Sequence, residues 1–270
     1  MRTSVLARQA SPILPRMDDR HDLAGFAARG FALLPGAVDA ALRQSLIDAV
    51  QRVQDSVPRL APELRERLTL ERDLPATHRD GIEAGSVGDA IFILGDPVAF
   101  DAVFWSVLRQ PVITQAIRAA LGGVEVAAHF MNVTIKQPGL GRRIGWHRDF
   151  ANGYASPPRS CFLRAMLCLD GMTGAGGATQ FIPGSHRLAD EEASAAKPPR
   201  GWQPPPDDIV TVTCAPGDLV LIHPKVLHGG GMNRSARTRR NLILQAGDAA
   251  VPLRAPPALE AVLGHRLTES

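Results

Sequence analysis

The stretch 125-EVAAHFMNVTIKQPG-139 marks a change in the character of the chain. It is rich in β-branched residues, and its second half alternates apolar with polar side chains before a Pro-Gly turn, a pattern typical of a β-strand with two different faces. Further short, strand-like segments follow, separated by Gly, Pro or Asp, at 161–171, 178–184, 208–214, 217–223 and 240–247. This succession predicts an antiparallel sandwich or barrel.

The chain before Val124 is predicted to be mostly helical. Residues 21–54 indicate a short helix, a strand at Phe31 to Leu34, and an amphipathic helix from about Asp39. Residues 94–123 indicate a second helical stretch that a proline interrupts. Because helices come first and strands follow, we expect a mainly β fold with flanking helices: a double-stranded β-helix (jelly roll, cupin-like) with an N-terminal helical layer.

The domain organisation is predicted from length and composition. A chain of 270 residues with 45% hydrophobic content can bury a full core. We expect one soluble domain over 21–270, helix-rich in 21–123, with the jelly-roll core in 124–250. Residues 1–20 are expected to form a disordered tail, although their arginine-bearing, acid-free opening also fits a transit peptide. The charged, proline-rich segment 188–208 indicates a long surface loop.

Charge and cysteine usage exclude several function classes. The net charge is only +3, and basic and acidic residues alternate along most of the chain, so nucleic-acid binding is not indicated. No apolar run is long enough to span a membrane. Three cysteines without Cys-x-x-Cys spacing, Cys161, Cys168 and Cys214, argue against a disulfide framework and a thiolate zinc site. We therefore expect a cytoplasmic protein, of unspecified oligomeric state, that acts on a small molecule.

A candidate metal site begins at 145-GWHRDF-150, where a single residue separates His147 from Asp149. Two histidines and one carboxylate on one face of an octahedron leave positions open for a cosubstrate and dioxygen, an arrangement diagnostic of non-haem Fe(II) oxygenases. A His-x-Asp pair alone is weak evidence. The third ligand must come from a distant strand, where His223 and His228 are available. Eleven residues after His228, Arg239 could pair with a dicarboxylate.

With these motifs in order, the sequence resembles the phytanoyl-CoA dioxygenase family of Fe(II)/2-oxoglutarate oxygenases. The resemblance covers most of the chain, through 26-FAARGFALLPGAVD-39, 135-IKQPGLGRRIGWHRDF-150, 178-ATQFIPGSHR-187 and 215-APGDLVLIHPKVLHGGGMNRSARTRRNLIL-244. The resemblance implies the cofactor Fe(II) and the cosubstrates 2-oxoglutarate and O2.

Carried over residue by residue, the resemblance implies that His147, Asp149 and His228 hold the iron. It makes Arg239 the partner of the 5-carboxylate of 2-oxoglutarate, with Arg240 and Arg237 as rivals, because side-chain direction reverses at each residue of a strand.

A second group of candidate cosubstrate ligands precedes the metal motif. Asn132, Thr134 and Lys136 alternate on one strand and so share a face, which is predicted to be the inner face near the cosubstrate. An exposed polar face is the alternative. Family members often carry a small hydroxyl residue where this chain has Gly230, so Thr134 could replace that contact.

The resemblance implies hydroxylation of an unactivated carbon of a small molecule, with release of succinate and CO2. A carboxylate-bearing compound and a secondary metabolite are the candidate substrate classes. Asp149 favours hydroxylation over halogenation, because related iron halogenases carry Ala or Gly at this position. Arg142, Arg143, Arg148 and Arg159 could attract an anionic substrate or be solvated surface charge.

Two other function classes stay open at this point. A cupin-type metalloenzyme that uses no 2-oxoglutarate would not need Arg239, and a catalytically silent barrel that acts as a binding module would not need an intact triad. Among the other histidines, His186 is expected to fix a turn, and His129 and His223 are expected to be structural or to lie behind the ligands. Trp146 and Phe150 could line a substrate pocket or fill the core.

Overall fold

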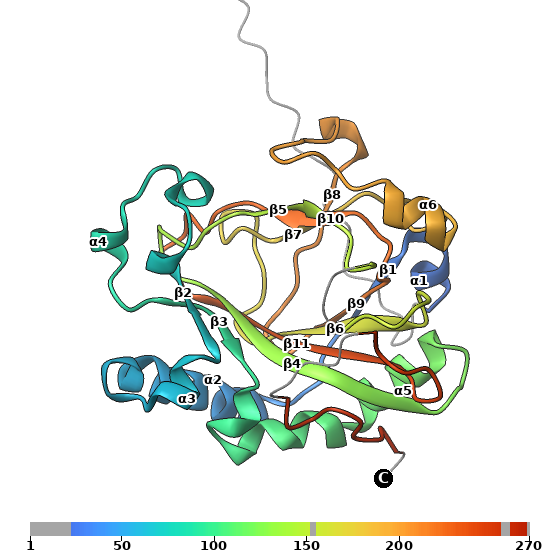
Figure 1. Cartoon of the computed structure of the whole chain (residues 1–270), viewed down its shortest axis with the longest axis horizontal. Helices are drawn as coiled ribbons and strands as arrows, with labels where there is room; N and C mark the ends of the chain where they lie inside the picture. Colours follow the sequence, from blue (N-terminus) through green and yellow to red (C-terminus); the bar gives the residue numbers. More distant parts are fainter. Residues whose placement is uncertain (1–22, 152–154, 255–259, 269–270) are drawn as a thin grey trace, which may run out of the picture.

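The computed structural model describes residues 23–151, 155–254 and 260–268. The predicted tail at 1–20 lies outside these residues. Within them the chain forms two antiparallel sheets, one of seven strands in the order β1-β9-β6-β11-β4-β3-β2 and one of four strands in the order β5-β10-β7-β8. Figure 1 shows the smaller sheet facing the larger one. The predicted jelly roll is confirmed.

The strands and helices have the following bounds. The large sheet contains β1 (Phe31–Leu34), β2 (Leu68–Leu70), β3 (Ile91–Gly95), β4 (Val126–Lys136), β6 (Phe162–Cys168), β9 (Leu219–Ile222) and β11 (Arg239–Asp248). The small sheet contains β5 (Ile144–His147), β7 (Thr179–Phe181), β8 (Val210–Thr211) and β10 (His228–Gly230). The α-helices are α1 (Leu23–Arg29), α2 (Ala40–Ser56), α3 (Pro62–Arg65), α4 (Ala84–Val87), α5 (Pro111–Ala120) and α6 (Asp190–Ala195). Short 3-10 helices are η1 (Val57–Arg59), η2 (Glu71–Asp73), η3 (Ala76–Arg79), η4 (Pro97–Ala99), η5 (Ala102–Arg109) and η6 (Pro206–Asp208).

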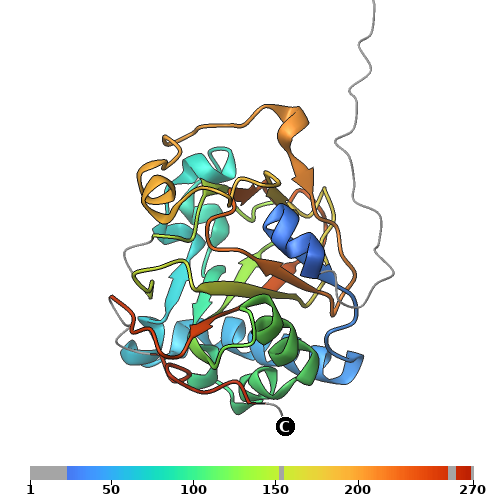
Figure 2. The same ribbon diagram turned by 90° about the vertical axis from the view of Figure 1, so that its right-hand side faces the viewer.

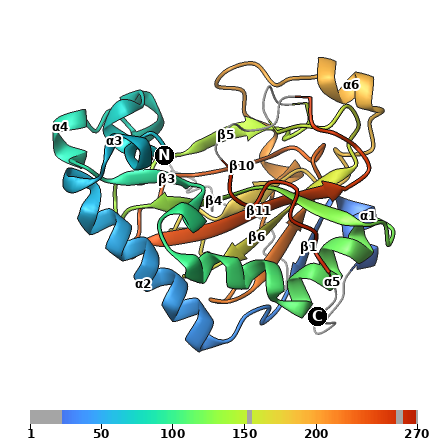
Figure 3. The same ribbon diagram turned by 60° about the horizontal axis from the view of Figure 1, so that its bottom comes forward.

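The helical layer covers the outer face of the large sheet. Figure 3 shows α2 and α5 against this face, and the side view of Figure 2 keeps the same order of helices, large sheet and small sheet. Leu46 and Val50 of α2 share one apolar core with Val133 of β4 and Leu242 of β11. The helix begins where the sequence predicts, because the carboxylate of Asp39 accepts a hydrogen bond from the backbone N–H of Leu42, at 2.8 Å.

The inner face of the large sheet carries the polar residues. Along β4, Met131, Val133 and Ile135 enter the core shared with the helices, so the alternate residues Asn132 and Thr134 face the small sheet. The predicted shared face is therefore an inner face, and the exposed-face alternative is wrong.

The prediction of a mostly helical first part is incomplete. Strands β2 and β3 lie within it and extend the large sheet beyond β4. The helical stretch expected from residue 94 begins later, because residues 94 and 95 end β3. The loop predicted at 188–208 includes the short helix α6. Short strands of three to five residues carry too little periodicity to be separated from helix by local pattern.

No helix among the described residues is long and apolar enough to cross a bilayer.

Candidate metal centre

The three predicted metal ligands converge on one point. His147 ends β5 and His228 begins β10, and the two are direct partners across the strand pair, with ring centroids 4.2 Å apart. Asp149 follows two residues after His147, and one ligand atom from each of the three side chains lies within 4.8 Å of the others. In the part of the chain that the structure describes, this is the one such group of His, Cys, Asp or Glu.

Glycines after His228 let β10 run between its two neighbours. A Cβ atom at Gly229 would approach the carbonyl oxygen of Ile144 to 3.0 Å, and one at Gly230 would approach that of Ala178 to 3.2 Å. Both distances are tighter than ordinary packing allows. The glycines thus keep β10 close to β5, which brings His228 against His147.

Hydrogen bonds orient both imidazoles for metal binding. Nδ1 of His147 lies 2.9 Å from the carbonyl oxygen of Gly145, and Nδ1 of His228 lies 3.1 Å from that of Val226. A carbonyl can only accept, so each Nδ1 carries the proton and each Nε2 presents a lone pair. These Nε2 atoms face the Asp149 carboxylate, at 3.6 Å for His147 and 3.8 Å for His228.

The charge state of the cluster suits a cation. Burial raises the pKa of the Asp149 carboxyl, but the Arg164 guanidinium, 2.7 Å away, and the two histidines outweigh burial and lower it. Burial also lowers the pKa of His228 to about 4. At neutral pH the site therefore presents an ionised carboxylate and a neutral imidazole at His228, which are the ligand forms of these groups.

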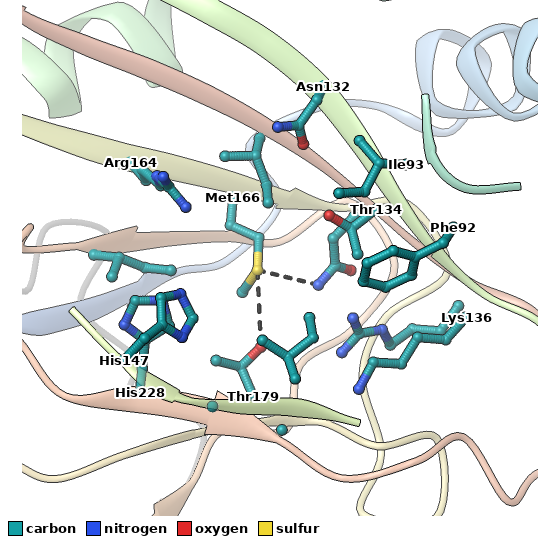
Figure 4. A pocket seen from close by; sticks show the side chains of 17 residues that line it. Phe92, Ile93, Asn132, Thr134, Lys136, His147, Arg164, Met166, Thr179 and His228 are labelled. Carbon is teal, nitrogen blue, oxygen red and sulfur yellow. Dashed lines mark hydrogen bonds between the residues drawn. The ribbon is translucent and has the colours of Figure 1, made fainter. Parts of the chain in front are cut away.

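A pocket of about 220 Å³ extends from the histidines between the sheets (Figure 4). His147 and His228 lie on one side, Lys136 lies across the pocket, and Met166 lies between them. Arg239 also lines this pocket and is the direct strand partner of Lys136. The metal cluster and two buried basic side chains thus face one another across a space suited to a small dicarboxylate.

Arg239 is buried but incompletely hydrogen-bonded. Its Nη1 donates to the carbonyl oxygen of Gly177 at 2.8 Å, whereas its Nε has no hydrogen-bond partner among the described residues. Burial lowers the pKa of Arg239 to about 10, so it remains a cation at neutral pH. Nζ of Lys136 donates to Gly177 and Gly231, and burial, together with repulsion from Arg239, lowers its pKa. The Nε–H of Arg239 is a buried donor without an acceptor on a positively charged side chain, and such a group is suited to an anionic ligand.

The rivals of Arg239 lie elsewhere. Arg240 lies outside the pocket and pairs with Asp170 at 2.9 Å, and Arg237 is exposed. The side-chain alternation of β11 explains the difference between Arg239 and Arg240. Asn132 and Thr134 both line the pocket, as predicted.

Sequence reasoning missed Asn241 and Arg164. Asn241 is buried on the pocket wall, and its Oδ1 has no hydrogen-bond partner within the described ranges. It stands two residues after Arg239, so strand alternation could have placed it on the same face. Arg164 interrupts the apolar strand β6, and a charged residue inside such a run was the available signal.

The other singled-out residues do not join the metal cluster. The rings of His186 and His223 pack against each other at 4.9 Å, and His129 contacts Gln245 at 3.1 Å. Trp146 donates to Gln203, and Phe150 is buried beside Phe162. These geometries favour the structural interpretation of the three histidines, whereas Trp146 and Phe150 line a second pocket together with His147.

The loop arginines have protein partners or lie at the surface. Arg143 pairs with Asp80, and Arg142 is buried and donates to the carbonyl oxygen of Pro75. Arg148 donates to carbonyl oxygens of three segments, and Arg159 is exposed. None of the four lines the pocket that Arg239 lines, whereas Arg148 lines the second pocket beside His147.

Stability is expected to depend on pH through buried His129, whose pKa burial lowers to about 4 from an unfolded value near 6.5. Between these values the unfolded chain binds a proton that the folded chain does not, so this stabilisation is complete above pH 6.5 and is lost as pH falls. From pH 7 to pH 5 the loss is about 2 kcal/mol. Glu260, whose pKa burial raises to about 8, opposes this trend in the same window.

The measurement is therefore a difference between variants. Urea unfolding of native protein, His129→Gln and His265→Gln at pH 7 and pH 5, with a chelator present, isolates the contribution of His129. His129→Gln is expected to lose about 2 kcal/mol less than the native protein on acidification, and His265→Gln, altered at an exposed histidine, should behave as native. Equal losses in all three proteins would contradict the assignment.

Comparison with known proteins places these features in a family. The sequence profile of the phytanoyl-CoA dioxygenase (PhyH) family matches residues 26–241. A "Dioxygenase trt7" from Aspergillus terreus is 29% identical over 201 residues, which are 68% of this chain and 65% of that protein. An L-proline trans-4-hydroxylase from Streptomyces griseoviridis is 27% identical over 173 residues, which are 54% of this chain and 63% of that protein. The matches thus span less than two thirds of either relative.

A solved structure shows the same fold. EctD from S. alaskensis, crystallised with 2-oxoglutarate and 5-hydroxyectoine, superposes with a TM-score of 0.68 at 22% identity. The superposition covers 94% of this chain and 82% of that one.

Proposed function

This chain belongs to the phytanoyl-CoA dioxygenase family, and we propose that it is an Fe(II)/2-oxoglutarate-dependent dioxygenase that hydroxylates an unactivated carbon of a small molecule. The observation that carries the proposal is the convergence of His147, Asp149 and His228 at one side of a pocket that Arg239 lines as well. Neither a 2-oxoglutarate-independent metalloenzyme nor a silent barrel requires both features.

The donor set fits ferrous iron. Two imidazole nitrogens and one ionised carboxylate oxygen are the ligands of the facial triad, and they leave three positions of an octahedron open. His147, Asp149 and His228 would hold the ion. The chemistry that the ion supplies when bound is activation of O2, coupled to decarboxylation of 2-oxoglutarate to succinate and CO2.

The opposite side of the pocket fits the cosubstrate. Arg239 would bind the 5-carboxylate of 2-oxoglutarate through its open Nε, and the amino group of Lys136 lies at the same end of the pocket. Thr134 and Asn132 line the wall between this end and the metal ligands, where a hydroxyl and an amide can orient the cosubstrate. Apolar side chains such as Met166, Ile222 and Ile243 exclude water from the reaction.

The substrate is proposed as a small molecule without a more specific identity. The bacterial relative is named for L-proline, and EctD was crystallised with 5-hydroxyectoine. These two compounds are small, and the residues that would recognise them are not fixed by the fold. We also propose that residues 21–270 form one domain, since helices and sheet share a core. A reducing cytoplasm is the proposed location, because Cys161, Cys168 and Cys214 are all free thiols.

Anaerobic titration tests the proposal directly. Metal-free protein is mixed with Fe(II) and then with 2-oxoglutarate, and the weak visible charge-transfer band of the chelate is followed. One chelate per chain is expected, because the described residues contain one ligand triad. A native protein that binds Fe(II) and shows no band would refute the oxygenase assignment. When the band is present, succinate release with a panel of small molecules identifies the substrate.

A further inference from the structure

A buried polar chain lies behind the metal cluster and is absent from the proposed mechanism. Arg164 on β6 and Gln245 on β11 are direct strand partners, and the neighbouring strand β4 contributes His129. Gln245 and His129 are almost completely buried, at 0% and 4% exposure. Buried polar side chains cost stability unless they are hydrogen-bonded, so each of these three side chains is expected to have a hydrogen-bond partner.

The direction of every hydrogen bond among these three side chains follows from the guanidinium of Arg164. A guanidinium can only donate, so Nε of Arg164, 3.4 Å away, requires Oε1 of Gln245 to accept. The Gln245 amide nitrogen then donates both to Nδ1 of His129, at 3.1 Å, and to the carbonyl oxygen of Ala155. His129 must accept at Nδ1 and is therefore neutral. The three side chains thus have only one consistent arrangement of donors and acceptors, and this arrangement fixes the orientation of the Arg164 guanidinium.

Arg164 reaches the metal cluster from this fixed position. Its Nη1 lies 2.7 Å from Oδ1 of Asp149, and its guanidinium carbon stacks over the Phe130 ring at 5.4 Å. Figure 4 shows Arg164 on the same side of the pocket as the two histidines. Gln245 also anchors Ala155, in the loop that follows Asp149. The carboxylate is thus held directly by Arg164 and indirectly through its own loop.

We propose that Arg164, oriented by Gln245 and His129, is a positioning residue that restricts Asp149 to binding the metal through one oxygen. Oδ1 is held in the ion pair with the Arg164 guanidinium, so Oδ2 is the oxygen available to the ion. This matters because the two histidines and a one-oxygen carboxylate leave three of six positions open, enough for a chelating 2-oxo acid and O2. A two-oxygen carboxylate would leave only two. The inference rests on the proposed iron site and specifies how that site keeps its open positions.

The test must preserve the charge at position 164. Removing the Arg164 cation would abolish its repulsion of the divalent metal ion, which strengthens metal binding. It would also disturb the buried Asp149, which weakens metal binding. Arg164→Lys keeps the charge but loses the rigid fork that bonds Asp149 and Gln245 together. Gln245→Leu keeps the arginine and removes its orienting partner. Arg67→Lys is the matched control, because Arg67 pairs with buried Asp96 outside the metal pocket.

Two readouts follow metal binding without turnover. Co(II) titration of the metal-free proteins gives affinity from the visible ligand-field bands, and metal-induced infrared difference spectra give carboxylate denticity, since the two carboxylate stretches are widely separated for one-oxygen binding and closer for two. Native protein and Arg67→Lys should show wide separation and equal affinity. Arg164→Lys should show a narrower separation and about 10- to 100-fold weaker binding, the usual effect of losing a group that orients a ligand.

The outcomes separate this inference from the proposed function. Either of two results would overturn the role of Arg164 alone. One is tight Co(II) binding with widely separated carboxylate stretches in both the native protein and Arg164→Lys. The other is a narrow separation of these stretches in the native protein. A native protein that binds no Co(II) would overturn the iron site with it. Should Arg164→Lys fail to fold, Gln245→Leu decides, with a narrower separation and about threefold weaker binding expected. Native behaviour of Gln245→Leu would then refute the proposal.

Discussion

Asp149→Ala is expected to reduce Fe(II) affinity several hundredfold and to bring 2-oxoglutarate turnover below detection. Four-ligand zinc sites have apparent binding energies of about 10–16 kcal/mol, or roughly 2.5–4 kcal/mol per ligand, which is the loss expected for one of three ligands here. The substitution also leaves the partly buried Arg164 cation without its carboxylate. Metal affinity is measured by anaerobic Fe(II) titration, and turnover by succinate release.

Asp170→Ala is the control for this substitution. Asp170 is a largely buried carboxylate that pairs with Arg240, and neither residue lines the metal pocket. The control also removes a carboxylate and an ion pair of similar energy, but at a different position in the protein. It should retain Fe(II) affinity and turnover, even if its unfolding midpoint falls. Retention of native Fe(II) affinity by Asp149→Ala would contradict the ligand assignment, whereas matched losses in both variants would indicate general destabilisation.

Arg239→Leu is expected to raise the Kd and KM for 2-oxoglutarate about 100-fold, with a smaller effect on kcat. Truncating one partner of a buried, hydrogen-bonded charge pair costs about 2–5 kcal/mol, and 100-fold corresponds to about 2.7 kcal/mol. The charge-transfer titration gives Kd directly. Arg240→Leu changes the next residue on the same strand, whose side chain lies outside the pocket, and should bind 2-oxoglutarate as the native protein does.

The choice of 2-oxo acid sharpens this experiment. 2-Oxobutyrate keeps the chelating end of 2-oxoglutarate but lacks the distal carboxylate. The native protein should bind it much more weakly than 2-oxoglutarate, and in Arg239→Leu this preference should nearly disappear. Lys136→Met tests the neighbouring basic side chain, whose Nζ already donates to two carbonyl oxygens and is expected to matter less. A larger loss of preference in Lys136→Met than in Arg239→Leu would transfer the carboxylate-binding role to Lys136.

Local sequence patterns predicted the parts of the site that local structure determines. His147 and Asp149 stand two residues apart, and His228 is followed by the glycines that its close strand pairing needs. The inner face of β4 followed from the two-residue period of a strand. These features depend on residues that are close together in the sequence, so they could be predicted from it.

The features that were missed depend on pairing between distant strands. Arg164 meets Gln245 because β6 and β11 pair in one register, and His129 joins them from β4. A shift of one residue in either pairing would reverse the faces and separate the three side chains. Strands β2 and β3 were missed for a related reason, since their strand character comes from pairing with each other and with β4, which lies further along the chain.

The direct pairing of His147 with His228 gives the metal ion a role in folding as well as in catalysis. The two histidines come from short strands of the small sheet, whose pairing is interrupted by a register shift. An ion held by both would act as a cross-link between chain segments that are far apart in the sequence, and it would stabilise the folded protein by mass action. Iron supply would then regulate not only the activity of each molecule but the number of molecules that escape proteolysis.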